Sequence, residues 1–320
     1  MLDATIKQIE KSEKFLIIFH ESPDGDAIGS SLALQAALTS LGKTADLACK
    51  DAIPAVFSFL LPSNTLIADD FIISDYDALI LIDCGDSKRT GFADRVKGYA
   101  KHGWPIINID HHNKNDLHRI AQTNYVDSEA AATAELMYLL LERMSIKIDK
   151  RIATWLLAGL YTDTGGFQHA NTSQLVYRIA SKLLSAGGKL RQISDNITLN
   201  RPLASLKLWG LVLSRAWRSK DGVIVSLVTM KDIAENDASA DDLAGVVNIL
   251  NTIPDSKATI LFVELPDGKI KASLRTEHDQ VDVSALAAVF GGGGHRKASG
   301  FTIDGKIAMS KDLRWSIKLT

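Results

Sequence analysis

The sequence of 320 residues has few cysteines, no long apolar run and almost no net charge. Its two cysteines, Cys49 and Cys84, form no CxxC pair and no disulfide framework, so we expect a reducing compartment, the cytoplasm. No apolar run approaches the roughly 18 residues of a membrane span, which predicts a soluble protein without a membrane partner. A formal net charge of −2 gives no global attraction to nucleic acid. An anionic substrate must therefore be bound by local cations, metal ions or backbone N–H groups.

The composition is that of an ordinary globular protein. Hydrophobic residues make up 46% and charged residues 23% of the chain, which is enough apolar material for two cores. We find no internal repeat and no low-complexity segment. We expect a first domain over residues 1–188, a helical linker over 189–219 and a smaller second domain over 220–320.

The first part of the chain alternates predicted strands and helices. Short apolar runs predict buried strands over 15–19, 78–82 and 105–109, with another strand over 44–50. Helices are predicted over 3–12, 26–38, 128–144 and 149–160, and then over 173–186 and 203–217. A polar, glycine-bearing turn is expected over 161–167. This order predicts an α/β domain with a mostly parallel sheet and helices on both faces.

The second part of the chain has a different pattern of predicted strands and helices. Strands are predicted over 223–228, 258–264 and 269–275, the last two joined by an Asp-Gly turn. Helices are predicted over 240–250 and 282–290, which together indicate a small α/β domain with a mixed sheet. Four glycines and His295 follow the last helix. This run either lets backbone approach a ligand or forms a tight turn between helix and strand.

Polar side chains stand where several of the predicted strands end. The apolar run over 105–109 stops in three metal-competent side chains, and similar endings occur elsewhere in the first domain. The residues concerned are Asp110, His111 and His112; His20 with Asp24 and Asp26; Asp83 with Asp86; and Asp163. In open α/β sheets, ligands collect at the carboxyl ends of the strands. We therefore expect these side chains to converge on one site.

Each of these endings also has a plainer interpretation. Asp24 can cap the helix that follows it, with Asp26 solvated. His111 and His112 can be two exposed loop residues, and Asp163 alone is uninformative. As a functional pair, the two adjacent imidazoles would serve as one metal ligand and one acid or phosphate contact.

Taken together, the side chains favour a metal site over a structural explanation. Mixed oxygen and nitrogen ligands without thiolate suit Mn²⁺, with Mg²⁺, Co²⁺ or Zn²⁺ as alternatives, and argue against a structural zinc. So many carboxylates would over-neutralise one cation. Two cations about 3.5–4 Å apart, bridged by a shared aspartate, make better electrostatic sense and suit in-line displacement at phosphorus.

Five segments in order carry a family resemblance. Residues 20–30, 83–86, 108–112 and 161–165 resemble the four motifs of the DHH phosphoesterases, in the RecJ-like superfamily. The run 291–295, with Ser273-Leu274-Arg275 upstream, is similar to the DHH-associated C-terminal domain. The resemblance is greatest to the nanoRNase type, oligoribonucleases that also act as phosphatases on adenosine 3′,5′-bisphosphate (pAp). It implies a hydrolase whose substrates are short RNA oligonucleotides and pAp, and a homodimer as the default assembly.

The resemblance also implies metal ligands. Two Mn²⁺ ions are implied, with Mg²⁺ or Co²⁺ as alternatives, and Asp83 would bridge them. The first ion would be held by His20, Asp24 and Asp83, and the second by Asp26, Asp83, His111 and Asp163.

Catalytic and substrate contacts follow from the same motifs. His112 would contact the scissile phosphate or protonate the leaving group, and Asp110 would orient the histidines. Thr276 stands where the family often has serine. Residues that would grip the substrate's phosphate and terminal nucleotide are Arg275, Thr276, Gly292, Gly293, Gly294 and His295, with Arg89 as a weaker phosphate candidate.

Three rival functions remain open. A phosphodiesterase acting on linear or cyclic dinucleotides is the main alternative. An inorganic pyrophosphatase shares the N-terminal motifs, but the run 291–295 argues against it. An inactive nucleotide-binding module is disfavoured because every predicted ligand is present.

Overall fold

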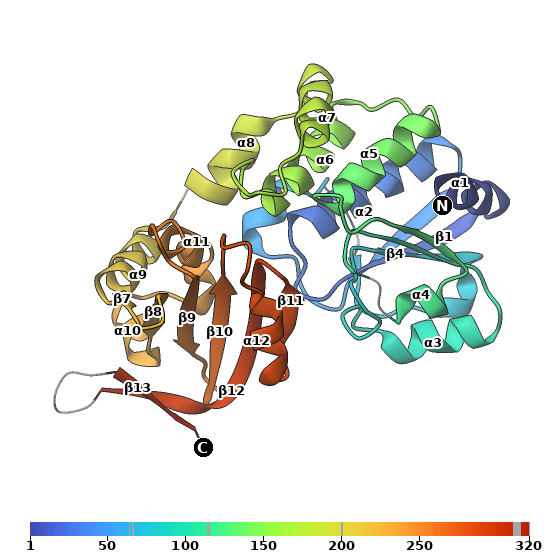
Figure 1. The fold of residues 1–320 in the computed structure, drawn as a ribbon. Helices are drawn as coiled ribbons and strands as arrows, with labels where there is room; N and C mark the ends of the chain where they lie inside the picture. Colours follow the sequence, from blue (N-terminus) through green and yellow to red (C-terminus); the bar gives the residue numbers. More distant parts are fainter. Residues whose placement is uncertain (64, 66, 114–115, 200, 310–314, 320) are drawn as a thin grey trace. The chain divides into compact units, whose positions relative to one another are not determined.

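The computed structural model describes residues 1–63, 65, 67–113, 116–199, 201–309 and 315–319. It divides the chain into two compact units, Met1–Asn200 and Arg201–Thr320 (Figure 1). The domain and linker limits that we drew at residues 188 and 220 stay predictions. Among the helices described, none is both long and apolar enough to cross a membrane.

The first unit contains a six-stranded sheet in the order β3-β2-β1-β4-β5-β6, in which every pair is parallel. The strands are β1 Lys14–Phe19, β2 Thr44–Ala48, β3 Ile67–Ala68, β4 Ala78–Ile82, β5 Ile106–Asp110 and β6 Thr123–Val126. The chain leaves β1 toward β2 and β3, then returns to β4 on the other side of β1. The carboxyl ends of β1 and β4 therefore form the switch point where ligands bind in such sheets.

Helices cover both faces of this sheet, as predicted (Figure 1). Alternate residues of β1 point to opposite faces, so Phe15 and Ile17 pack in one core and Leu16 and Ile18 in the other. The first core includes residues of α1 Leu2–Lys11, α2 Gly25–Ser40, α5 Thr133–Arg143, α6 Lys150–Asp163, α7 Gln174–Ser185 and α8 Leu190–Ser194. The second includes residues of α3 Ala93–Lys101 and α4 Leu117–Ile120.

Two glycines let α2 and α6 approach closely. A Cβ on Gly29 would lie 2.3 Å from the carbonyl oxygen of Trp155. A Cβ on Gly159 would lie 2.6 Å from Oδ1 of Asp26 and 2.7 Å from Cβ of Ala134. Neither position has room for a side chain, so the two helices meet backbone to backbone beside Asp26.

The second unit contains a mixed sheet in the order β11-β12-β10-β9-β8-β7, with β13 paired to β12. Among the described strands of this unit, only β8 and β9 pair in parallel, which confirms the predicted mixed sheet. Its strands are β7 Trp217–Arg218, β8 Val223–Val228, β9 Ala258–Glu264, β10 Lys269–Arg275, β11 Gly293–His295, β12 Ala298–Met309 and β13 Trp315–Leu319. Residues of α12 Val283–Val289 pack in one core, and those of α9 Leu203–Ser214, α10 Met230–Glu235 and α11 Val246–Leu250 in another.

Four predicted helices have the wrong limits. The helix expected over 240–250 is two pieces, Ala240–Leu243 and α11, because Gly245 has a φ of 90° that a helix cannot contain. The one expected over 203–217 ends at Ser214, and Trp217 begins β7. Residues 128–132 form turns instead of the start of α5, and α6 continues through residues 161–163, where we expected a turn.

Candidate metal centre

His20 directly follows β1 and is buried. Its Nδ1 lies 2.7 Å from the carbonyl oxygen of Glu21, which can only accept, so the proton is on Nδ1. Its Nε2 is buried without a hydrogen-bond partner among the described residues, 3.8 Å from Oδ1 of Asp24 and 3.6 Å from Oδ2 of Asp83. A buried ring nitrogen that faces two carboxylates fits a cation ligand.

Asp24 does cap the following helix. Its Oδ1 accepts from the backbone N–H of Asp26 at 3.0 Å and of Ala27 at 3.1 Å. The plainer interpretation of Asp24 is thus correct, but it leaves other lone pairs of the carboxylate for a cation. Asp26, however, is fully buried and not the solvated residue which that interpretation required.

Asp83 follows β4 with a φ of 57°, a left-handed conformation that aspartate tolerates better than most residues. Its Oδ2 faces Nε2 of His20 at 3.6 Å, and its Oδ1 faces Nε2 of His111 at 3.5 Å. One carboxylate therefore presents a different oxygen to each of two histidines. This arrangement suits a ligand that bridges two cations.

Asp26, His111 and Asp163 form the second group. One ligand atom from each lies within 4.8 Å of the others, and His111 Nε2 is 3.2 Å from Asp163 Oδ2. Nδ1 of His111 lies 3.3 Å from the carbonyl oxygen of Ala130. Asp163 stands in the last turn of α6 and not at a strand end, so our placement of it was wrong although it reaches the same site.

The carboxylates of this cluster perturb one another. Burial raises the pKa of Asp26 and of Asp163 well above the usual range, and neighbouring carboxylates add to the effect. Burial would also raise the pKa of Asp83, but His112 and His20 hold it well below its usual range. For His20, burial lowers the pKa, but Asp24 and Asp83 outweigh burial and raise it to about 10. Cations would replace these protons, so their binding releases protons.

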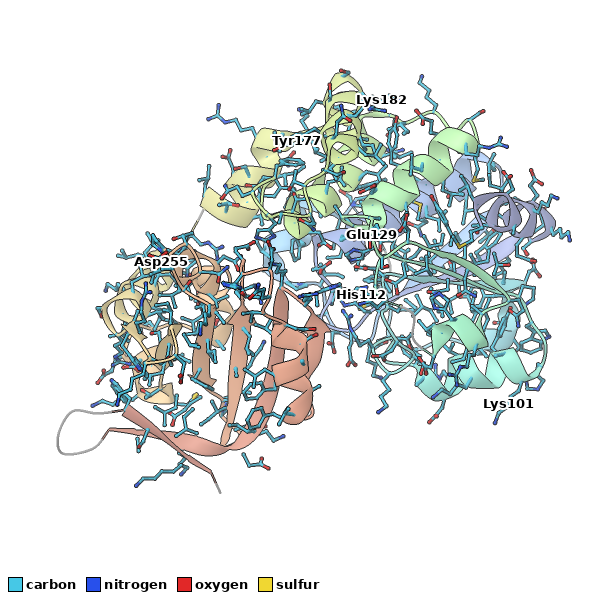
Figure 2. All side chains as sticks on the ribbon, in the orientation of Figure 1. Lys101, His112, Glu129, Tyr177, Lys182 and Asp255 are labelled. Atoms are coloured by element: carbon cyan, nitrogen blue, oxygen red, sulfur yellow. The ribbon has the colours of Figure 1, made fainter. Side chains whose placement is uncertain are left out.

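His112 belongs to a chain of polar contacts beside the two groups. Its Nδ1 lies 2.7 Å from Oδ1 of Asp110, whose Oδ2 accepts from the backbone N–H of Gly85 at 2.8 Å. Nη1 of Arg89 lies 3.0 Å from Nε2 of His112. Asp110 therefore orients His112, while the carbonyl of Ala130 supports His111. Figure 2 labels His112, which follows β5 at the carboxyl edge of the sheet.

Asp86 shapes the loop that carries Arg89. Its Oδ1 accepts from the backbone N–H groups of Lys88 at 2.8 Å and Arg89 at 3.0 Å. A Cβ on Gly85 would lie 2.6 Å from Nη1 of Arg89, so that glycine makes room for the guanidinium. Asp86 is thus a loop-forming residue.

Arg275 and His295 lie in one row across the sheet of the second unit. In the strand register, Ala298 pairs with Arg275 on one side and with His295 on the other. Directly opposed residues point to the same face, so the small Ala298 separates the two candidate substrate contacts. Asn248 on α11 accepts from Nε of Arg275 at 3.0 Å, and the carbonyl of Leu274 accepts from Nη1 at 2.8 Å. Among the described residues, Nη2 has no partner and can meet an anion.

Comparison with known proteins settles the family. The family model described as "DHH family, N-terminal domain" matches residues 14–160, and the DHHA1 domain matches residues 220–313. The bifunctional oligoribonuclease and PAP phosphatase NrnA of Thermus thermophilus is 33% identical over 290 residues, 90% of this chain and 84% of that protein. The chain belongs to the DHH family.

Other relatives support the same family assignment. NrnA of Bacillus subtilis is 24% identical over 302 residues, 93% of this chain and 92% of that protein. The crystal structure of an exopolyphosphatase-related protein from Bacteroides fragilis has a TM-score of 0.85 and 31% identity, and covers 94% of this chain and 90% of its own. DHH phosphoesterases are metal-dependent, which fits the two histidine–aspartate groups.

Different structural features characterise the four glycines at residues 291–294, within the DHHA1 match. Gly291 has a φ of 74° where α12 ends. A Cβ on Gly292 would lie 2.2 Å from the carbonyl oxygen of Gly300, and one on Gly294, with a φ of 137°, would lie 2.6 Å from that of Ala298. Gly293 is the one of the four that combines exposure, no positive φ and open space where a Cβ would lie. Backbone conformation thus explains Gly291, and close packing explains Gly292 and Gly294, whereas neither explains Gly293.

Gly293→Ala therefore separates ligand approach from folding. We expect KM for an RNA dinucleotide to rise about tenfold, roughly 1.4 kcal/mol, because a methyl group obstructs the substrate. The kcat and the melting temperature should stay near those of the wild type. Steady-state kinetics and thermal unfolding check this, and an unchanged KM would show that substrate does not approach Gly293.

Thr276, which the resemblance placed among the substrate contacts, uses its hydroxyl within the second unit. It is fully buried, its hydroxyl donates to the carbonyl oxygen of Lys257 at 2.6 Å, and it accepts from the backbone N–H of His278 at 3.0 Å. The hydrogen bonds of this hydroxyl are therefore made within the second unit. We therefore leave Thr276 out of the proposed substrate contacts.

The sequence interpretation missed the residues that hold these candidates. Thr133 and Ala134, at the start of α5, bind the carboxylates of Asp26 and Asp83. Asn248 holds Arg275. The only sequence signal was a threonine within a predicted helix, where its hydroxyl competes with the backbone and favours helix ends.

Proposed function

We propose that this chain is a two-metal phosphoesterase that hydrolyses short RNA oligonucleotides to mononucleotides and removes the 3′-phosphate of pAp. The observation that carries the proposal is Asp83, whose two carboxylate oxygens face histidines of two separate ligand groups. The names of relatives over 90% of the chain support the choice of substrates. The formal charge of −2 fits short substrates, since long nucleic acids call for extended basic surfaces.

The ligand types favour two Mn²⁺ ions, with Mg²⁺ or Co²⁺ as alternatives. His20, Asp24 and Asp83 would hold the first; Asp26, Asp83, His111 and Asp163 would hold the second. When bound, such a pair lowers the pKa of a water molecule and neutralises charge on the phosphate. We also propose a cytoplasmic homodimer, from the cysteine content and the family resemblance.

The remaining residues orient the substrate and move a proton. Asp110 holds the Nδ1 side of His112, and Arg89 contacts its Nε2. An incoming phosphate offers Arg89 a bidentate anionic partner, which releases Nε2 of His112 toward the leaving oxygen. Burial lowers the pKa of His112, but Asp110 and Asp83 outweigh burial and raise it to about 10. Once Arg89 has turned to the phosphate, Nε2 can therefore take up a proton and donate it to the leaving oxygen. Arg275 and His295 would bind the far end of the substrate.

A parallel assay tests the proposal. The full chain is incubated with a labelled RNA dinucleotide, with pAp and with pyrophosphate, each in Mn²⁺ or in EDTA. We expect mononucleotide release from the dinucleotide and AMP from pAp, both stopped by EDTA because the carboxylates alone cannot activate water. Turnover of pyrophosphate alone would contradict the proposal, and so would turnover that survives EDTA.

A further inference from the structure

Thr133 is a fully buried residue that contacts two of the proposed metal ligands at once. It is the first residue of α5, and its hydroxyl donates to Oδ1 of Asp83 at 3.0 Å. Its backbone N–H donates to Oδ2 of Asp26 at 2.5 Å, and the N–H of Ala134 donates to Oδ1 at 2.8 Å. The start of α5 thus fixes the orientation of both carboxylates.

These contacts fall on one side of the bridging carboxylate. The oxygen that Thr133 binds, Oδ1 of Asp83, is the one that faces His111, whereas Oδ2 faces His20. The carbonyl of Ala130, three residues before Thr133, lies 3.3 Å from Nδ1 of His111. The segment 130–134 therefore contacts Asp26, Asp83 and His111, all ligands of the proposed second cation.

The other ligands of the first cation are held elsewhere. His20 donates to the carbonyl of Glu21 at 2.7 Å, and Asp24 accepts from backbone N–H groups at the start of α2. Neither contact involves segment 130–134. The two cations thus depend on different parts of the fold, although they share Asp83.

We propose that Thr133 is a positioning residue that orients Asp83 for the second cation and selectively sets the affinity for it. The inference rests on the proposed two-metal function. The hydroxyl has one proton, which it gives to Oδ1, so the carboxylate is held with its remaining lone pairs toward His111 and His20. Without that bond the carboxylate can rotate away. Outer-shell partners of this kind typically change metal affinity by about 10–100-fold.

Titration of Mn²⁺ into the metal-free full chain, followed by calorimetry, tests this. Thr133→Val keeps the shape and the N–H but removes the hydroxyl, and Thr133→Ser keeps the hydroxyl. Thr5→Val is the matched control, a fully buried threonine whose hydroxyl, among the described residues, donates only to the carbonyl of Met1, at 3.4 Å. We expect two binding steps in the wild type, one of which weakens about 10–100-fold in Thr133→Val. Both steps should stay within about threefold of the wild type in Thr133→Ser and Thr5→Val.

Two results would overturn the inference: both steps unchanged in Thr133→Val, or both weakened to the same extent. The melting temperatures of the metal-free Thr133→Val and Thr5→Val variants show whether the change is merely structural. If Thr133→Val does not fold, Thr133→Ala is titrated with the same expectation. A wild type that binds two cations but turns over no RNA dinucleotide or pAp would sink the proposed function and leave this inference standing.

Discussion

Asp83→Asn is expected to lower kcat/KM for an RNA dinucleotide by at least about a thousandfold, roughly 4 kcal/mol of transition-state stabilisation. The carboxylate faces a histidine of each ligand group, so loss of its charge weakens the binding of both cations at once. Asparagine is a better substitution than alanine for this test. Asp83 has a φ of 57°, which asparagine tolerates and alanine does not, so the variant isolates the charge from backbone strain.

The matched control for this prediction is Asp86→Asn, three residues along the same loop. Asp86 accepts two backbone N–H groups through Oδ1, which an amide oxygen can also do. We expect kcat/KM to stay within about threefold of the wild type, because the substitution should cause only a small adjustment of the loop. Circular dichroism should show both variants folded. A folded Asp83→Asn variant with near-normal activity would refute the bridging role.

Gly159→Ala is expected to cost about 1–3 kcal/mol of folding free energy by overpacking. It should also lower kcat/KM by about a hundredfold, since a displacement near 1 Å at a reacting site can have that effect. The added methyl would lie 2.6 Å from Oδ1 of Asp26 and 2.7 Å from Cβ of Ala134. Helix α2 or α5 must move, and Asp26 moves with it. Thermal unfolding and steady-state kinetics measure the two effects.

Gly98→Ala provides the comparison within the same unit. Gly98 lies inside α3, and a Cβ there would meet nothing within 4 Å. Alanine should therefore stabilise the helix by about 0.5–1 kcal/mol and leave kcat unchanged. If Gly159→Ala behaved like Gly98→Ala, close helix contact would not be what positions Asp26.

The parallel sheet and its polar strand ends could be predicted because both are local signals. The runs that end before His20, Asp83 and Asp110 are short, apolar and buried on both faces, so pattern alone marks them as strands. The mixed sheet of the second unit followed from the Asp-Gly turn that joins two of its predicted strands.

Other parts of the site depend on contacts between distant segments. Asp163 reaches the cluster from the end of a helix, because α6 packs on α2 through Gly159. Thr133 binds Asp83 across 50 residues of sequence, and no local pattern encodes such a pair. Residues 128–132 favour a helix by composition, but they form none. The carbonyl oxygen of Ala130 contacts Nδ1 of His111 and so takes no part in a helical hydrogen bond.

Strands β1 and β4 end level at the candidate metal centre and β5 ends one residue further on, since Phe19 pairs with Ile82 and Ile82 with Ile109. A slip of β4 by one residue would shift Asp83 by about 3.3 Å and turn its side chain to the opposite face. Cation affinity is therefore a measure of strand alignment. In a refolding experiment, tight Mn²⁺ binding should return only when β1, β4 and β5 have reached their native register, later than the recovery of helical content.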